Sequence, residues 1–443
     1  MQKKNIATFP WAALGLFGLI VIMSLAYGFQ YLFPGVRLVQ YYRLVSLPFF
    51  LILIGLSWYG VRGWSALTSF SWPPVLGFLL MTIAFTLTAF FQSEALRPIP
   101  WPLVAGSVVG ISAYCQFKWG TRGSTIAFLC GAMVVYIFLI TRIPHVSGAA
   151  NMLETIELAS REFMSGETPY RHFDTSGGPV ALGYLPGLWL PYLPLIKLGL
   201  DMRIFNLIAL LLIILLFEKS LPKATRADTL SLTLYPFVLS STLALMVVHG
   251  HVWPYWLFLL ATTLFLMNAR FLLAAIFFGL CLASRQPALF LAGPLAAYMY
   301  RETGLKATLM YAAVAAVIYL SIVLPFAIWT GKEFWVYNYL ALAGAGAPDQ
   351  PHLSATNILG VWGLGGSLLK YWQVLITIGA MAVILIRTKL DPIWFVFVAG
   401  VTYCGLVFFN SYAVRYVYFP GFFLIAIALS KHFAMSLVPR GEL

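Results

Sequence analysis

Long apolar runs recur along almost the whole chain and restrict its fold more than any other feature. Runs of about 18 or more residues match a hydrocarbon core roughly 30 Å thick, and residues 11–33, 230–248 and 414–429 are examples. In lipid only helices or closed barrels satisfy the backbone, and these runs lack the alternation of barrel strands. We therefore expect an all-α fold, a polytopic membrane bundle of about 12–14 helices.

The charged residues support this expectation. Only 9% of the 443 residues are charged, against roughly 25% in an average soluble domain, which excludes an ordinary water-soluble surface. The net charge of +13 does not indicate a nucleic-acid partner, because the basic residues are spread over short connections between apolar runs. The cysteines lie inside apolar runs without metal-ligand spacing, which indicates buried free thiols.

The basic connections predict the topology. With Lys3 and Lys4 inside, and the first span retained instead of cleaved as a signal peptide, each later basic cluster also falls inside, and both termini are cytoplasmic. The polar segment from residue 142 to 178 is then outside. We predict spans near residues 10–33, 44–61, 73–91, 101–117, 124–141, 203–217, 228–248, 252–268, 271–283, 287–300, 307–329, 371–386, 392–409 and 414–430.

This count requires that one apolar stretch, residues 179–200, does not cross. Three prolines break it into pieces too short to span, so we expect it to lie in the interface or to re-enter. The predicted topology depends most on the pair 271–283 and 287–300, because merging these two spans into one would reverse the membrane orientation of every span upstream. The predicted organisation is then residues 1–123 as additional N-terminal helices, 124–436 as the core with external loops 142–202 and 330–370, and 437–443 as a tag remnant.

A short amphipathic helix is expected at the start of the first external loop. Its apolar residues recur at helical spacing, Glu157 and Arg161 form a favourable i, i+4 pair, and Gly166 ends it. Such a helix would lie along the membrane surface. The apolar face comprises Met152, Leu153, Ile156, Ala159 and Phe163, and the polar face carries Glu154, Glu157 and Arg161.

From here the sequence resembles a family. The loop helix is followed by the motif 166–171 (Gly-Glu-Thr-Pro-Tyr-Arg), Phe173-Asp174, Gly178-Pro179 and an aromatic stretch. This order resembles the first external loop of the GT-C superfamily, polytopic glycosyltransferases that use polyprenyl-phosphate sugars and include mannosyltransferases. Three further landmarks each open a later apolar run: residues 250–253 (Gly-His-Val-Trp), 284–287 (Ser-Arg-Gln-Pro) and Arg415-Tyr416.

The resemblance implies an inverting transfer of a sugar from a polyprenyl-phosphate donor to a lipid, glycan or protein acceptor on the non-cytoplasmic face. We further expect an integral protein of a prokaryotic plasma membrane, with membrane lipid among its partners and, from the spread of the basic residues, no nucleic acid. Members usually carry an Asp at the start of the loop helix. Here residues 150–154 read Ala-Asn-Met-Leu-Glu, so the acid is either displaced to Glu154 or absent.

The catalytic residues that we predict follow from this chemistry. Glycosyl transfer needs a base for the acceptor hydroxyl, and a carboxylate at the membrane boundary suits that role. Glu154 is the preferred base and Glu157 the second candidate, although both also fit a solvated helix face. Asn151 could only orient a substrate, because an amide cannot accept the proton.

Two arginines at outer ends of apolar runs, Arg285 and Arg415, are predicted to bind the phosphate. The positive-inside rule gives them no reason to be there, and a guanidinium fork fits phosphate oxygens. Snorkelling to lipid headgroups is the alternative. Their neighbours in the landmarks, Gln286 and Tyr416, join the predicted binding set.

The remaining predicted binding residues lie on the same outer face. His249 and His251 flank one glycine, a spacing that fits a metal, a sugar or ordinary interfacial hydrogen bonds. Tyr170 joins the predicted binding set, and His172 and Asp174 follow it and either contact a sugar or organise the loop. Metal use stays open, since by resemblance some superfamily members require a divalent cation and others do not.

Two other functions compete with the transferase. A transporter or flippase of a lipid-linked saccharide would share the arginines and the aromatic outer surface, but it should also bury charges or broken helices at the midplane. Almost no acids fall inside the predicted spans, which favours chemistry at the boundary. A catalytically lapsed, sugar-binding member of the superfamily is the third hypothesis, because the usual Asp is missing.

Overall fold

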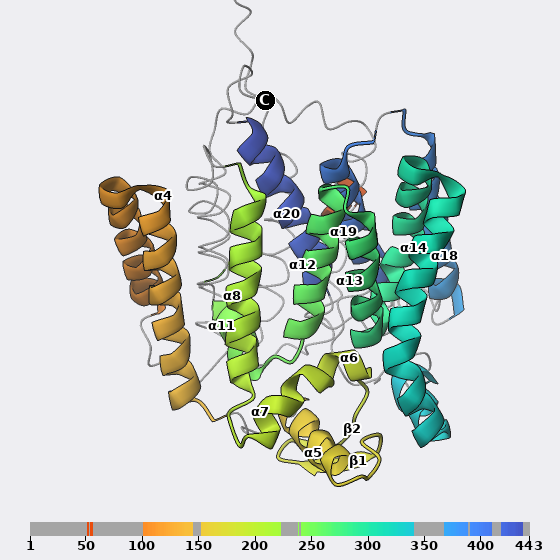
Figure 1. The fold of residues 1–443 in the computed structure, drawn as a ribbon, viewed down its shortest axis with the longest axis horizontal. Helices are drawn as coiled ribbons and strands as arrows, with labels where there is room; N and C mark the ends of the chain where they lie inside the picture. The colour runs from red at the N-terminus through yellow and green to blue at the C-terminus, as the bar shows by residue number, and fades with distance from the viewer. Residues whose placement is uncertain are drawn as a thin grey trace, which may run out of the picture. The chain divides into compact units, whose positions relative to one another are not determined.

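The computed structural model describes residues 51–52, 54–55, 101–144, 152–222, 238, 241–340, 367–388, 390–409 and 418–436 (Figure 1). Its chain forms two compact units, which are described separately. The first unit comprises residues 1–132, 218–243 and 349–443, and the second comprises 133–217 and 244–348. The predicted spans 10–33 and 73–91 lie outside the described residues, as does nearly all of 44–61.

Helices dominate the described residues, as the apolar runs predict, and the only strands among them form one small hairpin. Within the same residues, two helical stretches are long and apolar enough to cross a membrane, Gly123–Arg142 and Gln286–Thr330. Five further helices are apolar but shorter. The hairpin is the one departure from an all-α chain.

Helix α4 (Trp101–Arg142) folds back on itself. The Ser112 hydroxyl lies 2.9 Å from the Ser124 hydroxyl and donates to the Ser124 carbonyl at 3.0 Å. Twelve residues of straight helix would separate them by about 18 Å. At the crossing Gly131 lets the two arms approach, because a Cβ there would lie 2.8 Å from the Val108 side chain. The separate spans predicted at 101–117 and 124–141 agree with these two arms.

The first unit also contains α18 (Ser367–Ile386), α19 (Pro392–Phe408) and α20 (Phe419–Ser436). Asp391 caps α19 by accepting the amide hydrogen of Ile393, and Pro392 follows at the first helical position. α19 and α20 pack so closely that a Cβ on Gly400 would lie 2.7 Å from the Gly421 carbonyl oxygen. Cys404 is buried in this contact, whereas Cys130 on α4 is exposed, so the expectation that all the cysteines are buried is wrong at Cys130.

The second unit is built on α8 (Arg203–Ser220), α11 (Ser241–His249), α12 (Trp253–Met267), α13 (Phe271–Ser284) and α14 (Ala292–Thr330). α12, α13 and α14 pack in chain order, and Figure 1 shows them side by side. Arg285 is extended, with φ −149° and ψ 136°, and separates α13 from the short helix η3 (Gln286–Leu291). The predicted spans 271–283 and 287–300 are thus distinct elements.

Within α14 the backbone breaks at Gly304, whose φ of 80° and ψ of 171° are not helical. Glycine tolerates this conformation, which a residue with a Cβ rarely adopts. The break falls where the sequence predicts a connection between 287–300 and 307–329. The second arm packs on α13, because a Cβ on Gly279 would lie 2.7 Å from the Ala315 carbonyl oxygen.

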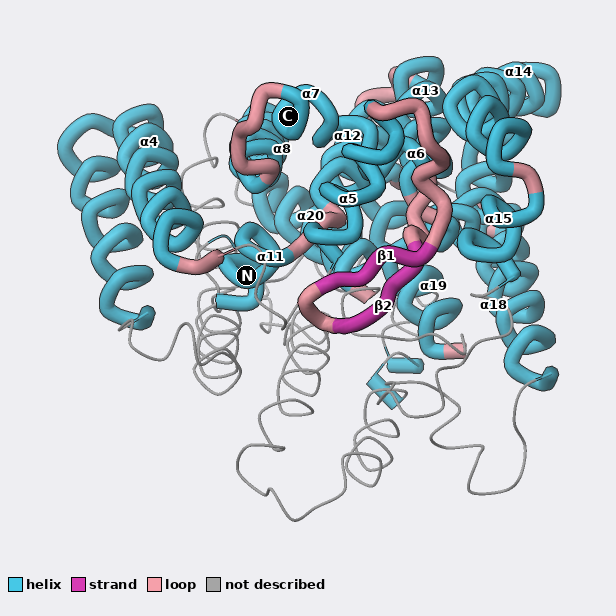
Figure 2. Tube along the Cα trace, turned by 90° about the horizontal axis from the view of Figure 1, so that it is seen from below, coloured by secondary structure: helices cyan, strands magenta, loops and turns pink. Residues whose placement is uncertain are grey.

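The loop between α4 and α8 forms a folded layer of short elements. It contains α5 (Met152–Met164), the antiparallel strands β1 (His172–Thr175) and β2 (Gly178–Ala181), α6 (Pro186–Trp189), η2 (Leu190–Tyr192) and α7 (Leu193–Lys197). Figure 1 shows these elements gathered at one end of α12 and α13, and Figure 2 shows the hairpin as a narrow ribbon beside α5. The prolines therefore divide residues 179–200 into short pieces, as predicted.

Two predictions for α5 are confirmed. Leu153, Ile156 and Ala159 are buried, so the apolar face is the predicted one, and Gly166 ends the helix in the left-handed region at φ 88°. The aromatic core beneath α5 includes Tyr170, Trp189, Phe326 and Phe334. The last two come from α14 and from α15 (Lys332–Trp335), which continues into the π-helix η4 (Val336–Leu340).

Candidate functional site

Arg285 reaches its position because α13 ends where α6 crosses it. Gly187 in α6 makes the crossing possible, because a Cβ there would lie 2.8 Å from both the carbonyl carbon and the oxygen of Ala283. Ser284 is fully buried at this crossing, and the extended backbone of Arg285 then leads into η3. The loop layer and the end of α13 therefore fix the arginine together.

Arg285, Tyr184 and His251 form a cluster that we call the arginine cluster. The guanidinium carbon of Arg285 lies 5.8 Å from the centre of the Tyr184 ring, in a cation–π arrangement. A second neighbour of that ring is His251, whose ring centre is 4.4 Å away. Arg285 is 8% exposed and His251 3%. Two residues that the sequence predicts for substrate binding thus meet at one loop tyrosine.

The cluster combines a buried cation with a neutral imidazole. Burial lowers the pKa of His251 well below 6.5, and the charge of Arg285 lowers it further. A neutral imidazole has one N–H donor and one acceptor nitrogen, so the cluster offers a positive charge and a hydrogen-bonding ring at one place. An anion with hydroxyl or phosphoryl oxygens suits this combination.

His249 and His251 belong to a tight turn between α11 and α12. Gly250 is required at its centre, because a Cβ there would clash with the Met246 carbonyl oxygen. Burial, and then the charge of Arg203, lower the pKa of His249 to about 4. Among the described residues no group of three or more His, Cys, Asp or Glu could hold a metal ion, so metal use stays an open prediction.

Gln286 connects the arginine cluster to η4. Its side-chain amide donates to the Asn338 carbonyl at 2.8 Å and lies 3.3 Å from the Asn338 amide oxygen. Asn338 is fully buried. Gln286, the residue that follows Arg285, therefore holds η4 in place. Because both contacts use its Nε2, less of its amide is left to bind a substrate.

Glu154 lies on α5 and holds the turn of the hairpin. Its carboxylate accepts the Ser176 amide at 3.0 and 3.1 Å and the Ser176 hydroxyl at 2.6 Å. Three hydrogen bonds give this carboxylate a structural role whatever else it does. The role of general base predicted for Glu154 remains a prediction.

Glu157 makes the predicted ion pair with Arg161, at 2.7 Å between Arg161 Nη2 and Glu157 Oε1. The side chains are 24% and 61% exposed, so the pair is a surface feature of α5. This prediction of an i, i+4 pair is confirmed. Such a pair is worth a few tenths of a kcal/mol.

The other loop residues lie in two different environments. Tyr170 has no exposed surface, because it donates to the Tyr184 carbonyl at 3.1 Å and packs on Phe334 with ring centres 4.9 Å apart. It is therefore a core residue, out of reach of a substrate in this conformation. His172 and Asp174 are exposed on the hairpin, and His172 Nδ1 lies 3.2 Å from the Tyr337 hydroxyl. Asn151, Arg415 and Tyr416 lie outside the described residues.

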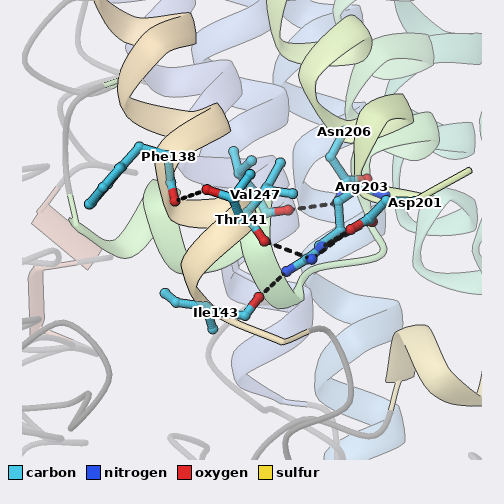
Figure 3. A network of polar contacts seen from close by, with 8 residues as sticks. Phe138, Thr141, Ile143, Asp201, Arg203, Asn206 and Val247 are labelled. Atoms are coloured by element: carbon cyan, nitrogen blue, oxygen red, sulfur yellow. Dashed lines mark hydrogen bonds and ion pairs between the residues drawn. The ribbon is translucent and has the colours of Figure 1, made fainter.

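A polar network that was not predicted from the sequence lies at the start of α8 (Figure 3). Arg203 pairs with Asp201 at 2.6 Å and donates to the carbonyls of Ile143 and Ile140 at 2.5 and 2.9 Å. The sequence did indicate a special role for Arg203, because it stands at the outer end of a predicted span. Arg285 was selected by the same criterion. Asn206 stands within the same apolar run, where an amide is unusual.

Comparison of the chain with models of protein families, with curated proteins and with solved structures found no match. The site therefore has to be interpreted from its own geometry.

Proposed function

We propose that the chain is an integral-membrane glycosyltransferase of GT-C type, which transfers a sugar from a polyprenyl-phosphate donor to an acceptor outside the cytoplasm. The observation that carries the proposal is the arginine cluster. It brings the loop, through Tyr184, to the His-Gly-His turn and to the arginine of the Ser-Arg-Gln-Pro landmark. These are three separate parts of the sequence resemblance.

Exposed apolar side chains support the membrane setting of this proposal. On α14 Ile328 is 73% exposed and Val317 63%, and Val134 on α4 is 66% exposed. In water exposed apolar side chains such as these favour association, whereas in a bilayer they contact lipid tails. Both helices belong to the stretches long and apolar enough to cross a membrane. The proposal accordingly retains a polytopic bundle whose outer end carries the loop layer.

In the proposed reaction an acceptor hydroxyl attacks the anomeric carbon of the donor, and the bond from that carbon to the phosphate oxygen breaks. The attacking hydroxyl loses its proton to a base, and the polyprenyl phosphate departs with the electron pair. Arg285 stabilises the phosphate by charge-assisted hydrogen bonds. His251 and the Tyr184 ring border the same place. Glu154 is the proposed base, and Arg415 the proposed second cation.

The test is transfer by purified protein reconstituted in lipid, with a panel of radiolabelled polyprenyl-phosphate sugars and a membrane extract as acceptor. Wild type is compared with Arg415→Ala and Glu154→Gln. Gln retains an oxygen that accepts the Ser176 bonds but cannot take a proton, so loss of turnover in that variant identifies a base. A second variant, Ser176→Ala, weakens the turn alone and should keep most of the activity.

Two outcomes would contradict the proposal. Turnover that survives Glu154→Gln removes the base assignment. Absence of transfer with every donor, together with measurable movement of the lipid-linked sugar across the bilayer, would assign the protein to the transporters instead.

A further inference from the structure

Asn206 uses both N–H donors and the oxygen of its amide in one buried place. It lies in the first turn of α8 and has no exposed surface. Its Nδ2 donates to the carbonyls of Val247 and Gly250 at 2.8 and 2.9 Å, and its Oδ1 accepts the Tyr192 hydroxyl at 2.8 Å. The amide therefore joins α8 to two other segments, and Figure 3 shows Asn206 beside Val247.

Two of these bonds end on the turn that carries His249 and His251. The last carbonyls of a helix have no partner within it, and here side chains bond to carbonyls of the turn, while the Met246 carbonyl also accepts the Gly250 amide. Asn206 takes Val247 and Gly250, while Trp253 Nε1 donates to Met246 at 2.8 Å. The backbone is thus held on both sides of His249 and directly before His251.

The third bond connects the turn to the loop layer. Tyr192 belongs to η2, and its hydroxyl lies 2.8 Å from Asn206 Oδ1 and 3.4 Å from the His251 carbonyl oxygen. Tyr184, eight residues earlier in the same loop, packs against the His251 ring at a tilt of 39°. The loop therefore contacts the His251 backbone through Tyr192 and the His251 ring through Tyr184. Asn206 connects Tyr192 to the backbone carbonyls of the same turn.

We propose that Asn206 is a positioning residue: its amide fixes the His249–His251 turn so that the His251 ring stays against Tyr184 and beside Arg285. The inference rests on the proposed function for its consequence in catalysis, but the position of His251 can be measured separately. Substitution should release His251 without unfolding the second unit.

The experiment measures acylation of His251 by diethyl pyrocarbonate in protein reconstituted in lipid, by peptide mass spectrometry. Asn206→Leu keeps the number and branching of the side-chain heavy atoms and removes all three bonds, so we expect His251 to react about tenfold faster, as local opening becomes easier. Tyr192→Phe removes one hydroxyl and should give a smaller rise. Thr263→Val is the matched control. It also removes a buried hydroxyl, but the bond of that hydroxyl is to the Leu259 carbonyl of its own helix.

Thiol labelling distinguishes local release from general loosening. Cys281 is fully buried in α13. With N-ethylmaleimide, Cys281 should stay as unreactive in Asn206→Leu as in wild type, and protein denatured in detergent gives the fully labelled reference. If Asn206→Leu does not fold, the same comparison is made with Tyr192→Phe.

The catalytic consequence is a loss of kcat for sugar transfer in Asn206→Leu, with little change in the overall fold. His251 protected as in wild type, in a folded variant, would overturn the inference, and so would a parallel rise at Cys281. Absence of transfer in wild type would instead overturn the proposed function and leave the His251 measurement interpretable.

Discussion

The carboxylates of α5 and the basic groups of the arginine cluster lie in opposite surroundings, although the sequence predicts both for one reaction. Glu154 and Glu157 are partly exposed, and each contacts residues of its own helix or of the neighbouring hairpin. Arg285 and His251 are buried and are brought together from helix ends 34 positions apart in the sequence. The difference teaches that local periodicity places the acids, whereas tertiary packing places the cation.

This contrast leads to different expectations for mutation. A buried charge or imidazole is surrounded by groups arranged for it, so its removal should have a large effect. An exposed ion pair is screened by solvent and should contribute little. The predictions below are ordered accordingly, from the largest expected effect to the smallest.

Arg285→Ala should reduce sugar transfer by about a hundredfold or more, the usual cost of removing a group that stabilises developing charge. Arg285→Lys should recover part of the loss, because Lys keeps the charge without the planar fork. Initial rates in lipid vesicles measure both. Equal rates for Arg285→Ala and wild type would show that the buried arginine is not needed for transfer, contrary to the contrast with the exposed carboxylates of α5.

Gly187→Ala should destabilise the second unit by about 2 kcal/mol, because the added methyl group forces α6 away from the end of α13. Thermal unfolding of the detergent-solubilised protein provides the measurement. Gly379→Ala on α18 is the control, since nothing lies within 4 Å of its Cβ, and a helical Ala should stabilise slightly. A similar loss in both variants would mean that the α6–α13 crossing is not critical.

Stability should fall as the pH falls from about 6.5 towards 4. An unfolded chain binds protons at its histidines near 6.5, whereas the folded protein holds the pKa of His249 at about 4 and that of His251 well below 6.5. The stability is thus complete above the unfolded pKa and is lost on acidification. His249→Asn should reduce this loss in the free energy of unfolding by about 1–2 kcal/mol. The melting temperature, measured between pH 7.5 and 4.5, tests the slope, and Thr263→Val should leave it unchanged.

Arg161→Ala should change stability by only about 0.3 kcal/mol and leave transfer rates as they are, because its pair with Glu157 is exposed. Chemical denaturation and the transfer assay measure the two effects. A loss comparable with that of Arg285→Ala would show that α5 contributes to the reaction through its exposed face, contrary to the distinction drawn above.

Much of the fold follows from local sequence signals. The apolar face of α5, its end at Gly166, the short pieces of residues 179–200 and the breaks at Arg285 and Gly304 were all predictable, because each depends on spacing, proline or glycine. The hairpin was not predicted. Its strands are four residues each, too short for an alternating pattern.

The site was less predictable, because its arrangement depends on contacts between distant segments. Arg285 and His251 could be named from their places at the ends of apolar runs, but nothing local indicates that Tyr184 lies between them. Likewise Asn206 is unusual in sequence only as an amide within an apolar run, and its three bonds are needed to identify its partners. Tyr170 illustrates the reverse case, since a motif residue proposed for binding is buried in the aromatic core.

The most direct test of the central claim is the affinity of reconstituted protein for a radiolabelled polyprenyl phosphate without the sugar, measured for wild type, Arg285→Ala and Arg161→Ala. The account predicts saturable binding that Arg285→Ala weakens about tenfold or more, as for a lost charge-assisted contact, and that Arg161→Ala leaves unchanged. Equal affinity in wild type and Arg285→Ala would contradict the assignment of the arginine cluster as the phosphate site.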